Sequence, residues 1–378
     1  MDITSKSFCV MPWTGLATDP TGGYKPCCWM DNTDVFRDKL ENYESSEYLQ
    51  RLKTQFLNGE YPDTCARCKW NDEQGLVSKR QRENQKYFKD KTFNNEQDYT
   101  VIDLRLSNKC NLKCATCSPK SSSSIYDEVK ENIDTHQFSY LYVYKKVSKF
   151  NLTTPYDDVE IDGLIDRISP NARVYFTGGE PGLVKPAFRV LEMLLEKGYN
   201  KTVNLEFNSN FQALNTKWFD LLSNFKGLMM PSIDAVSEQA ELIRYGCDWN
   251  TVDNNLREFI NRCPDFKIML FPTVSILNIF YLKDILVWAD TLQAKHVEVN
   301  FTNRLSYPKY YNIANMPDEL KQRATEYLKD IDHPHVQDIV KHLSASADEM
   351  SWNNFIKNMD KLDAIRNTDW RKVLEKLQ

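Results

Sequence analysis

Beyond residue 100 the chain alternates between short runs suited to strands and longer runs suited to amphipathic helices. The strand-like runs are rich in β-branched and aromatic residues and lie at 101–106, 174–177, 203–207, 228–233, 268–276 and 296–301. Helix-like patterns at 186–197, 216–224, 250–262 and 282–292 separate most of them. This alternation predicts parallel strands joined by crossover helices. Because six such units fall two short of a complete barrel, we predict an α/β fold, a partial (β/α)6 TIM-like barrel.

Both ends of the chain depart from this pattern. The first 83 residues are rich in cysteine and turn residues, and the last part reads as helices, including 318–331 and 352–377. A chain of 378 residues has room for two or three domains. The predicted organisation is a small Cys-rich N-terminal module at 1–83, a connector at 84–99, the barrel at 100–302 and a helical C-terminal extension at 303–378.

The charge balance excludes some partners. The 48 basic and 53 acidic residues give a net charge of −5, so the chain has no electrostatic footprint for nucleic acid or an anionic membrane. The start of the sequence lacks a signal-peptide pattern, and the most apolar stretch, 266–282, is interrupted by Lys267, Pro272 and Asn278. We therefore expect a cytoplasmic protein with reduced thiols, in which clustered cysteines indicate metal binding or catalysis.

Three cysteines follow the first predicted barrel strand directly. Cys110, Cys114 and Cys117 form a C-x3-C-x2-C triplet, in the first βα loop and so on the catalytic face of the barrel. Three thiolates are too few for a closed zinc site, but they can hold a cubane iron–sulfur cluster with one iron open to another ligand. The alternatives are zinc with a distant fourth ligand, or chance clustering. The isolated Cys247 and Cys263 are expected to pack as small hydrophobic residues.

A glycine-rich segment follows the second predicted strand. Gly178, Gly179, Glu180 and Pro181 end this strand and open a helix. Adjacent glycines allow a backbone carbonyl to approach a ligand, and proline suits the first helical turn. Its place at the next strand end after the cysteine loop makes this otherwise common pattern a candidate part of the same site.

These two motifs together resemble those of the radical SAM superfamily. The resemblance covers about residues 100–302 and implies that Cys110, Cys114 and Cys117 hold a [4Fe–4S] cluster. Its fourth iron would bind the amino and carboxylate groups of S-adenosylmethionine (SAM), and Gly178–Pro181 would contact the amino group. It also implies that an electron from the cluster cleaves SAM to a 5′-deoxyadenosyl radical, which abstracts hydrogen from a substrate.

Weaker similarities continue along the predicted barrel. Polar residues at successive strand ends resemble the family's contacts to the SAM ribose and carboxylate, and the cofactor-binding candidates are Asn208, Ser232, Asp234, Arg244 and Thr273. Arg244 is the candidate partner of the SAM carboxylate. Each residue alone is equally compatible with a cap or a turn. The sequence identifies no catalytic acid, base or radical-bearing residue.

The N-terminal cysteines resemble the SPASM/twitch modules that hold an auxiliary [4Fe–4S] cluster. The implied ligands are Cys9, Cys27, Cys65 and Cys68, with Cys28 as an alternative to Cys27 because both fit a Gly-x4-Cys spacing. Such modules usually follow the barrel, whereas this group precedes it, so a structural zinc site is the other interpretation. The polar run at 71–80 is expected to be a solvated helix, with a role in binding as the alternative.

The predicted function is that of a radical SAM enzyme acting on a peptide or protein side chain. The alternative is radical modification of a nucleotide, sugar or other small molecule, and a non-catalytic electron-transfer protein is a weaker interpretation. The expected partners are the substrate and an electron donor such as flavodoxin or ferredoxin. A membrane partner is not expected, and the charge balance argues against nucleic acid. The role of the long first crossover, 118–172, is left open.

Overall fold

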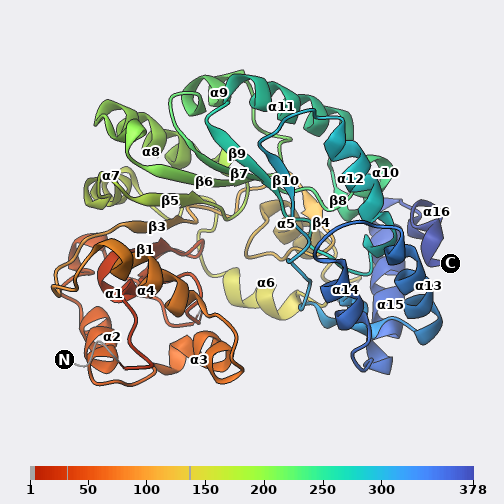
Figure 1. Ribbon diagram of the computed structural model, residues 1–378, viewed down its shortest axis with the longest axis horizontal. Helices are drawn as coiled ribbons and strands as arrows, with labels where there is room; N and C mark the ends of the chain where they lie inside the picture. Colours follow the sequence, from red (N-terminus) through yellow and green to blue (C-terminus); the bar gives the residue numbers. More distant parts are fainter. Residues whose placement is uncertain (1–4, 32, 136–137) are drawn as a thin grey trace. The chain divides into compact units, whose positions relative to one another are not determined.

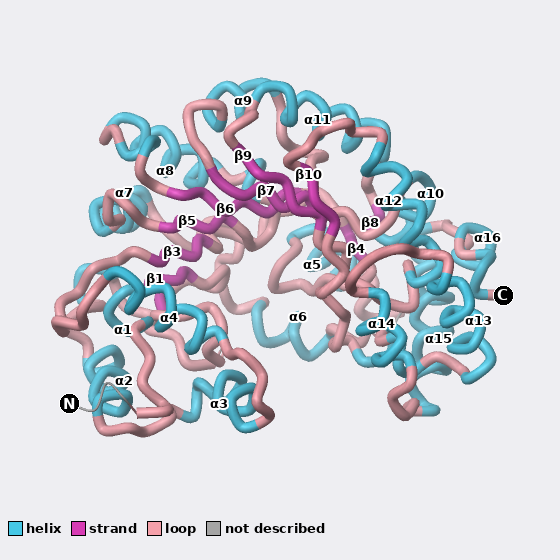
Figure 2. Tube along the Cα trace, in the orientation of Figure 1, coloured by secondary structure: helices cyan, strands magenta, loops and turns pink. Residues whose placement is uncertain are grey.

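Six strands form within a few residues of their predicted positions. They are β3 (Val101–Leu104), β5 (Arg173–Phe176), β6 (Asn204–Ser209), β7 (Gly227–Pro231), β9 (Phe266–Leu270) and β10 (Val297–Val299). Their hydrogen-bonding order, β10-β9-β7-β6-β5-β3, follows the chain, and the β3–β5, β5–β6 and β9–β10 pairs are parallel (Figure 2). Parallel strands in chain order are the series of a (β/α) barrel. The predicted fold class, α/β with a partial (β/α)6 TIM-like barrel, is confirmed.

The computed structural model describes residues 5–31, 33–135 and 138–378. Its chain divides into two compact units, each made of segments from different parts of the sequence. Figure 1 colours the chain from its N-terminus to its C-terminus. Unit 1 contains Met1–Lys109, Val147–Phe207 and Asn224–Gly227, and unit 2 contains Cys110–Lys146, Asn208–Ser223 and Leu228–Gln378. The boundaries of these units differ from the predicted domain boundaries at residues 83, 99 and 302. The predicted domain organisation stays a prediction.

Within unit 1 the Cys-rich segment adds two strands beside β3. Strand β1 (Gly15–Thr18) pairs in parallel with β3, with Leu16 opposite Ile102, and β2 (Tyr24–Lys25) pairs antiparallel with β1. A Cβ atom on Gly15 would lie 2.2 Å from the Pro26 carbonyl oxygen, so this hairpin requires glycine. The N-terminal segment therefore shares a sheet with the first barrel strand.

Three of the described α-helices of unit 1 begin at side-chain caps, from Ser46, Ser78 and Asp157. The α-helices of this unit are α1 (Met11–Thr14), α2 (Glu47–Leu57), α3 (Ala66–Glu73), α4 (Lys79–Asp90), α7 (Asp158–Arg167) and α8 (Lys185–Glu196). Ser78 and Gln81 form a capping box at α4, and Asp157 and Glu160 form one at α7. The segment 84–99, predicted as a connector, therefore begins inside α4.

Unit 2 holds the remaining helices and a two-stranded ribbon. Its helices are α5 (Ser123–Glu131), α6 (Leu141–Val147), α9 (Thr216–Leu222), α10 (Ser237–Ile243), α11 (Trp249–Arg262), α12 (Leu282–Asp290), α13 (Asp318–Lys329), α14 (Val336–Leu343), α15 (Glu349–Arg366) and α16 (Trp370–Val373). The ribbon pairs β4 (Lys113–Cys114) with β8 (Arg244–Tyr245). Left-handed Asn367 ends α15, so the predicted helix 352–377 is two helices.

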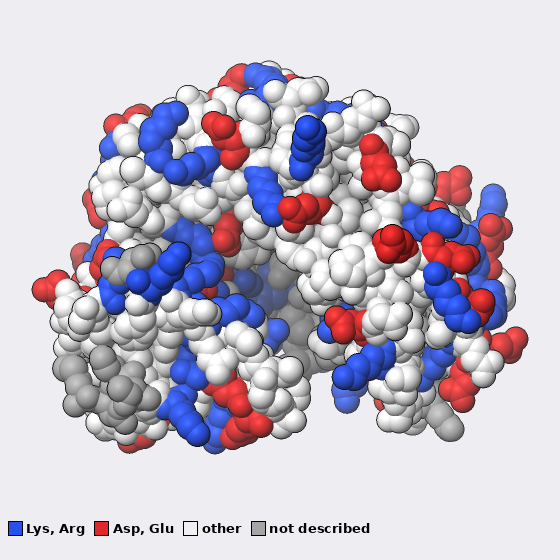
Figure 3. Space-filling model, viewed as in Figure 1, with Lys and Arg blue, Asp and Glu red and all other residues white. Residues whose placement is uncertain are grey.

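The helical extension packs into the core of unit 2. Leu320, Ile339, Phe355 and Trp370 from four different helices are buried in one cluster with residues that follow β9. Lysine and arginine side chains are interspersed with acidic ones over the visible face (Figure 3). Among the described residues, no helix combines the length and apolar character that crossing a membrane requires.

Candidate functional site

The cysteine triplet lies in a loop of unit 2 that α5 and the end of α10 hold in place. Ser124 Oγ donates to the Cys110 carbonyl at 2.8 Å, and the Ala115 amide donates to the Ile243 carbonyl at 2.8 Å. Burial, and then the neighbouring Cys114 and Cys110, raise the pKa of Cys117 to about 12. Cys114 and Cys110 therefore lie near enough to Cys117 to influence its pKa.

The β4–β8 ribbon places Arg244 opposite Cys114. Arg244 Nη2 lies 2.7 Å from Asp234 Oδ2, and its Nη1 lies 3.7 Å from Cys114 Sγ. The other Asp234 oxygen accepts the Thr273 amide at 2.8 Å. Burial lowers the pKa of Arg244, but Asp234 and Cys114 outweigh it and raise the pKa above its usual value. Four residues predicted from separate motifs thus form one network.

Two polar atoms near these strand ends are buried without a hydrogen-bond partner in the described part of the chain. They are Arg244 Nε and Asn208 Oδ1. Beside Asn208, the Ser232 amide donates to the Ser209 carbonyl at 2.7 Å and ties the ends of β6 and β7 together. Because an unsatisfied buried donor or acceptor is costly, these atoms mark places where a polar ligand would be stabilised.

The glycine-rich segment lies in unit 1, against the residues that directly precede Cys110. Gly178 has a φ of +96°, and a Cβ on Gly179 would lie 2.2 Å from the Lys109 carbonyl oxygen. The Glu180 amide donates to that oxygen at 2.7 Å, and Pro181 opens a short 3-10 helix. Glu180 is buried, and its carboxylate accepts the Gly182 amide at 3.1 Å. The glycines thus allow close packing against the strand-end loop of β3.

Four N-terminal cysteines line one small cavity in unit 1. They are the four predicted auxiliary ligands, Cys9, Cys27, Cys65 and Cys68, whereas Cys28 does not line it. Burial, followed by Cys68, raises the pKa of Cys65 to about 12. Burial also raises the pKa of Cys9. The Phe8, Trp13 and Phe93 rings pack beside Cys9 with centroids 5.0–5.8 Å apart.

Sequence reasoning missed Arg80, which lines the same cavity. It is buried, donates to the Phe8 carbonyl at 3.0 Å and pairs with Asp72 at 2.8 Å. Tyr61 also donates to Asp72. Residues 73–77 of the run 71–80 are exposed, as expected, but Ser78 and Arg80 are buried as a helix cap and a cavity wall.

Asn278 was also missed, although its signal was present as a polar residue inside an apolar stretch. It is fully buried and donates to the Asp234 and Thr273 carbonyls at 2.8 and 3.1 Å. It therefore holds the strand-end loops that carry two cofactor candidates. Cys247 is half-buried near Arg244 and Cys114, and burial is the main cause that raises its pKa to about 12.

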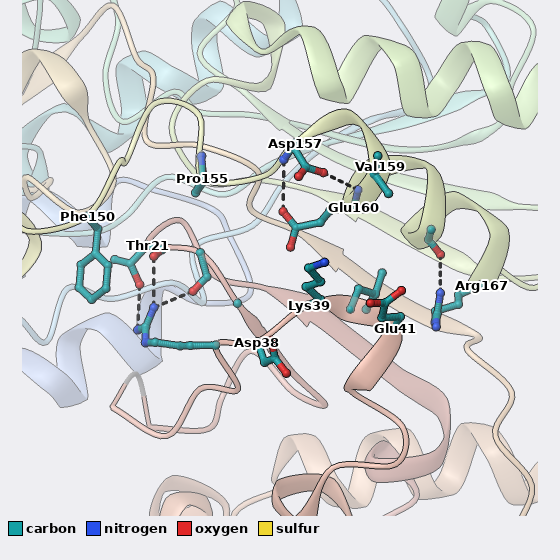
Figure 4. A pocket seen from close by; sticks show the side chains of 15 residues that line it. Thr21, Asp38, Lys39, Glu41, Phe150, Pro155, Asp157, Val159, Glu160 and Arg167 are labelled. Carbon is teal, nitrogen blue, oxygen red and sulfur yellow. Dashed lines mark hydrogen bonds between the residues drawn. The ribbon is translucent and has the colours of Figure 1, made fainter.

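A larger cavity of about 760 Å³ in unit 1 holds none of the predicted site residues (Figure 4). Its Arg37 is stacked over Phe150, 4.5 Å from the ring centroid, and donates to the Gly22 and Thr21 carbonyls at 2.6 and 3.1 Å. Because Arg37 is engaged in this way, it fastens the β1–β2 turn to the segment before α7.

Among the described residues, no three Cys, His, Asp or Glu side chains converge closely enough to hold a single metal ion. A zinc site places all its ligands about 2.0–2.3 Å from one atom. A cubane cluster spreads its thiolates over separate iron atoms. The two kinds of site therefore place different demands on the spacing of the cysteines.

No family model matches the sequence, and no curated protein is similar to it. Among solved structures, the chain is similar to native anSMEcpe with bound AdoMet and Kp18Cys peptide, with 19% identity and a TM-score of 0.43 over 65% of this chain and 62% of that one. It is also similar to Streptococcus suis SuiB bound to S-adenosylmethionine, with 15% identity and a TM-score of 0.35 over 81% of this chain and 52% of that one. For TYW1 with a lysine-pyruvate adduct bound, the identity is 15% and the TM-score is 0.29, over 61% of this chain and 71% of that one. The chain spans less than two thirds of the first two structures, and none of these scores assigns a family or an activity by itself.

Proposed function

We propose that this chain is a radical SAM enzyme. The observation that carries the proposal is the network in unit 2, in which Arg244 joins Asp234 and the Thr273 loop to Cys114 of the cysteine triplet. Each of these residues was selected from sequence for a role at a cluster or at SAM. A packed core alone does not require a buried guanidinium between a thiol and a carboxylate.

The residues present fit the cluster and SAM. Burial raises the pKa of Cys114, so its thiolate is costly until a cationic metal centre compensates it. Arg244 Nε is a buried donor with no partner among the described residues, as a contact to a carboxylate would require. When bound, the cluster and SAM supply one-electron cleavage to a 5′-deoxyadenosyl radical. The protein contributes three thiolates, the orienting Arg244–Asp234 pair and polar strand ends, with Asn208, Ser232 and Gly178–Pro181 as further SAM contacts.

The test is anaerobic reconstitution with iron and sulfide, followed by SAM and dithionite. We expect 5′-deoxyadenosine from the wild type and none from the Cys110→Ala/Cys114→Ala/Cys117→Ala variant. Cys263→Ala is the matched control, because this buried cysteine contacts the Phe219 carbonyl and is predicted to serve packing alone. A wild type with a full complement of iron that forms no 5′-deoxyadenosine would contradict the proposal.

We further propose that Cys9, Cys27, Cys65 and Cys68 hold an auxiliary [4Fe–4S] cluster. Support comes from their shared cavity and from Arg80, whose charge lowers the pKa of Cys9 against the effect of burial. Iron and zinc analysis tests this. We expect about four fewer iron atoms per chain in Cys9→Ala/Cys65→Ala, with SAM cleavage retained. One zinc per chain in the wild type, lost in this variant, would instead indicate a structural zinc site.

We propose a peptide or protein side chain as the substrate and the cytoplasm as the compartment. The support is the resemblance of the Cys-rich segment to modules that accompany peptide maturation. A cluster held by Cys9, Cys27, Cys65 and Cys68 would supply an acceptor for the electron of a substrate radical, which would favour net oxidation. The test measures 5′-deoxyadenosine formation with a candidate precursor peptide encoded beside this gene. We expect formation above the peptide-free background and a mass change in the peptide; stimulation by a nucleotide or sugar alone would contradict this choice.

A further inference from the structure

Helices α3 and α4 and the loop between them carry exposed apolar side chains. Trp70, Leu76 and Val77 are 56%, 50% and 59% exposed, although each is large enough to be stabilised by burial. They lie within eight residues of one another, on the segment that follows Cys68 (Figure 1). Clustered apolar side chains on a surface commonly mark an interaction site.

Two arginines flank an aromatic ring next to this segment. Arg67 and Arg82 lie over the Trp29 ring, with guanidinium carbons 3.9 and 5.2 Å from its centroid. Both arginines are exposed, and neither has an acidic partner among the residues that the structure describes. Two like charges held over one indole without a counter-charge leave a local positive potential that an acidic partner would neutralise.

Two acidic side chains of these helices already have basic partners. Asp72 pairs with Arg80 at 2.8 Å, and Glu83 pairs with Arg173 at 2.7 Å. The surface formed by Arg67, Lys69, Trp70, Leu76, Val77 and Arg82 is here called the α3–α4 surface. Its three basic side chains are exposed and outnumber the one exposed carboxylate of α3, that of Glu73.

Trp29 connects this surface to the four-cysteine cavity. Its side chain lines the cavity, and its backbone amide donates to Cys27 Sγ at 3.4 Å. A partner seated over Arg67 and Arg82 would lie against the ring that forms one wall of the cavity. The indole is thus the element shared by the basic surface and the proposed cluster.

We propose that the α3–α4 surface is the docking site of an acidic one-electron carrier protein that reduces the auxiliary cluster. This inference rests on the proposed function. In this step the carrier would be oxidised by one electron and the auxiliary cluster reduced by one. Passing this electron to the cluster of the cysteine triplet, where SAM is cleaved, would leave the auxiliary cluster oxidised again and able to accept an electron from the substrate radical. An apolar centre with a charged rim suits a weak, steered encounter, because charge accelerates association while the small contact permits release.

Binding and turnover are measured separately in the reconstituted holoenzyme. The test variant is Arg67→Glu/Arg82→Glu, and Arg67→Gln/Arg82→Gln gives a graded neutralisation. The control is Lys146→Glu/Lys341→Glu, which makes the same charge change at exposed lysines of α6 and α14. The probe is an acidic flavodoxin. Its oxidised form is titrated for affinity at several ionic strengths, and its reduced form and dithionite are compared as drivers of 5′-deoxyadenosine formation.

We expect charge reversal to weaken flavodoxin binding about tenfold or more at low salt and to flatten its salt dependence, with an intermediate effect for the Gln variant. The control should bind within twofold of the wild type. The flavodoxin-driven rate should fall in parallel, while iron content and the dithionite-driven rate stay unchanged.

Unchanged flavodoxin affinity in the Glu variant would overturn the docking proposal. This would hold even if the same variant bound another acidic ligand, such as a peptide, more weakly. An equal loss of the dithionite-driven rate would overturn it too, because the arginines would then support the protein itself. Failure of the wild type to form 5′-deoxyadenosine with dithionite would overturn the proposed function instead. The flavodoxin affinities do not depend on SAM cleavage, so they would still test the docking proposal.

Discussion

Arg244 and Asp234 form an ion pair of 2.7 Å beside the cysteine triplet, and both side chains are largely buried. The pair fixes the guanidinium so that another of its nitrogens lies 3.7 Å from Cys114 Sγ. Arg244 was predicted as a partner of the SAM carboxylate. In the structure it already has an internal partner, and its Nε is the donor left without a partner among the described residues.

Replacing Asp234 with Asn should destabilise the protein, because it leaves the Arg244 charge buried without compensation. The expected loss in free energy of unfolding is about 3 kcal/mol. Asp162→Asn is the matched control, since its pair with Arg189 is exposed, and we expect less than about 1 kcal/mol there. Denaturant titration of both variants checks this, and equal losses would contradict the role of burial.

Gly179→Ala should displace the residues that precede Cys110. A Cβ at this position would lie 2.2 Å from the Lys109 carbonyl and 2.6 Å from the Asn108 carbonyl carbon, and backbone cannot yield as a side chain does. We expect a loss of about 1–3 kcal/mol, with less iron retained by the triplet. Gly163→Ala in α7 meets only contacts of 3.6 Å or more and should be neutral or slightly stabilising. If Gly179→Ala changed stability as little as Gly163→Ala, the backbone before Cys110 would be able to move aside for a Cβ atom, and the prediction would be contradicted.

Cys27→Ala should remove the iron of the auxiliary cluster, and Cys28→Ala should retain it. The reason is that Cys27 lines the cavity with the other three cysteines, whereas its neighbour does not. Iron analysis of both variants checks this, with Cys28→Ala as the control because it makes the same substitution at the adjacent residue. Iron loss in Cys28→Ala alone would reverse the assignment.

The Asp72 carboxylate should make stability depend on pH. Burial raises its pKa, but hydrogen bonds from Tyr61, Ser78 and Arg80 outweigh burial and hold the pKa below its usual value. The stabilisation is therefore present above about pH 4 and is lost as the pH falls through the folded-state pKa.

Measured by denaturant titration, the free-energy difference between the wild type and Asp72→Asn should shrink as the pH falls from 5 to 3. Exposed Glu73→Gln on the same helix is the control and should change stability by less than about 0.5 kcal/mol throughout. A pH-independent difference for Asp72→Asn would contradict the assignment.

The periodic parts of the fold were predictable, because alternation of strand and helix patterns depends on local sequence. The six strands and most helices of the barrel lie where the pattern places them. The pairing of β1 with β3 was not predictable, since four residues, Gly15–Thr18, carry little periodic signal and their partner lies more than 80 residues away. The break at Asn367 depends on one left-handed residue inside a helical pattern.

The candidate site also combines features that local sequence predicts with features that depend on distant partners. Motif cysteines and strand-end polar residues could be selected as candidates from sequence because their chemistry is unusual at that spacing. Arg80 and Asn278 were not, because their roles depend on burial and on partners distant in sequence, Phe8 and Asp234. The Arg244–Asp234 pair also required the structure, since sequence assigned both residues to SAM and neither to the other.

The most direct test of the central claim is the EPR spectrum of the reconstituted, dithionite-reduced protein before and after SAM is added. The account predicts that SAM shifts the signal of one reduced [4Fe–4S] cluster, because SAM binds its open iron. This shift should persist in Cys9→Ala/Cys65→Ala and vanish in Cys110→Ala/Cys114→Ala/Cys117→Ala. A spectrum that SAM leaves unchanged, in protein with a full complement of iron, would contradict the account.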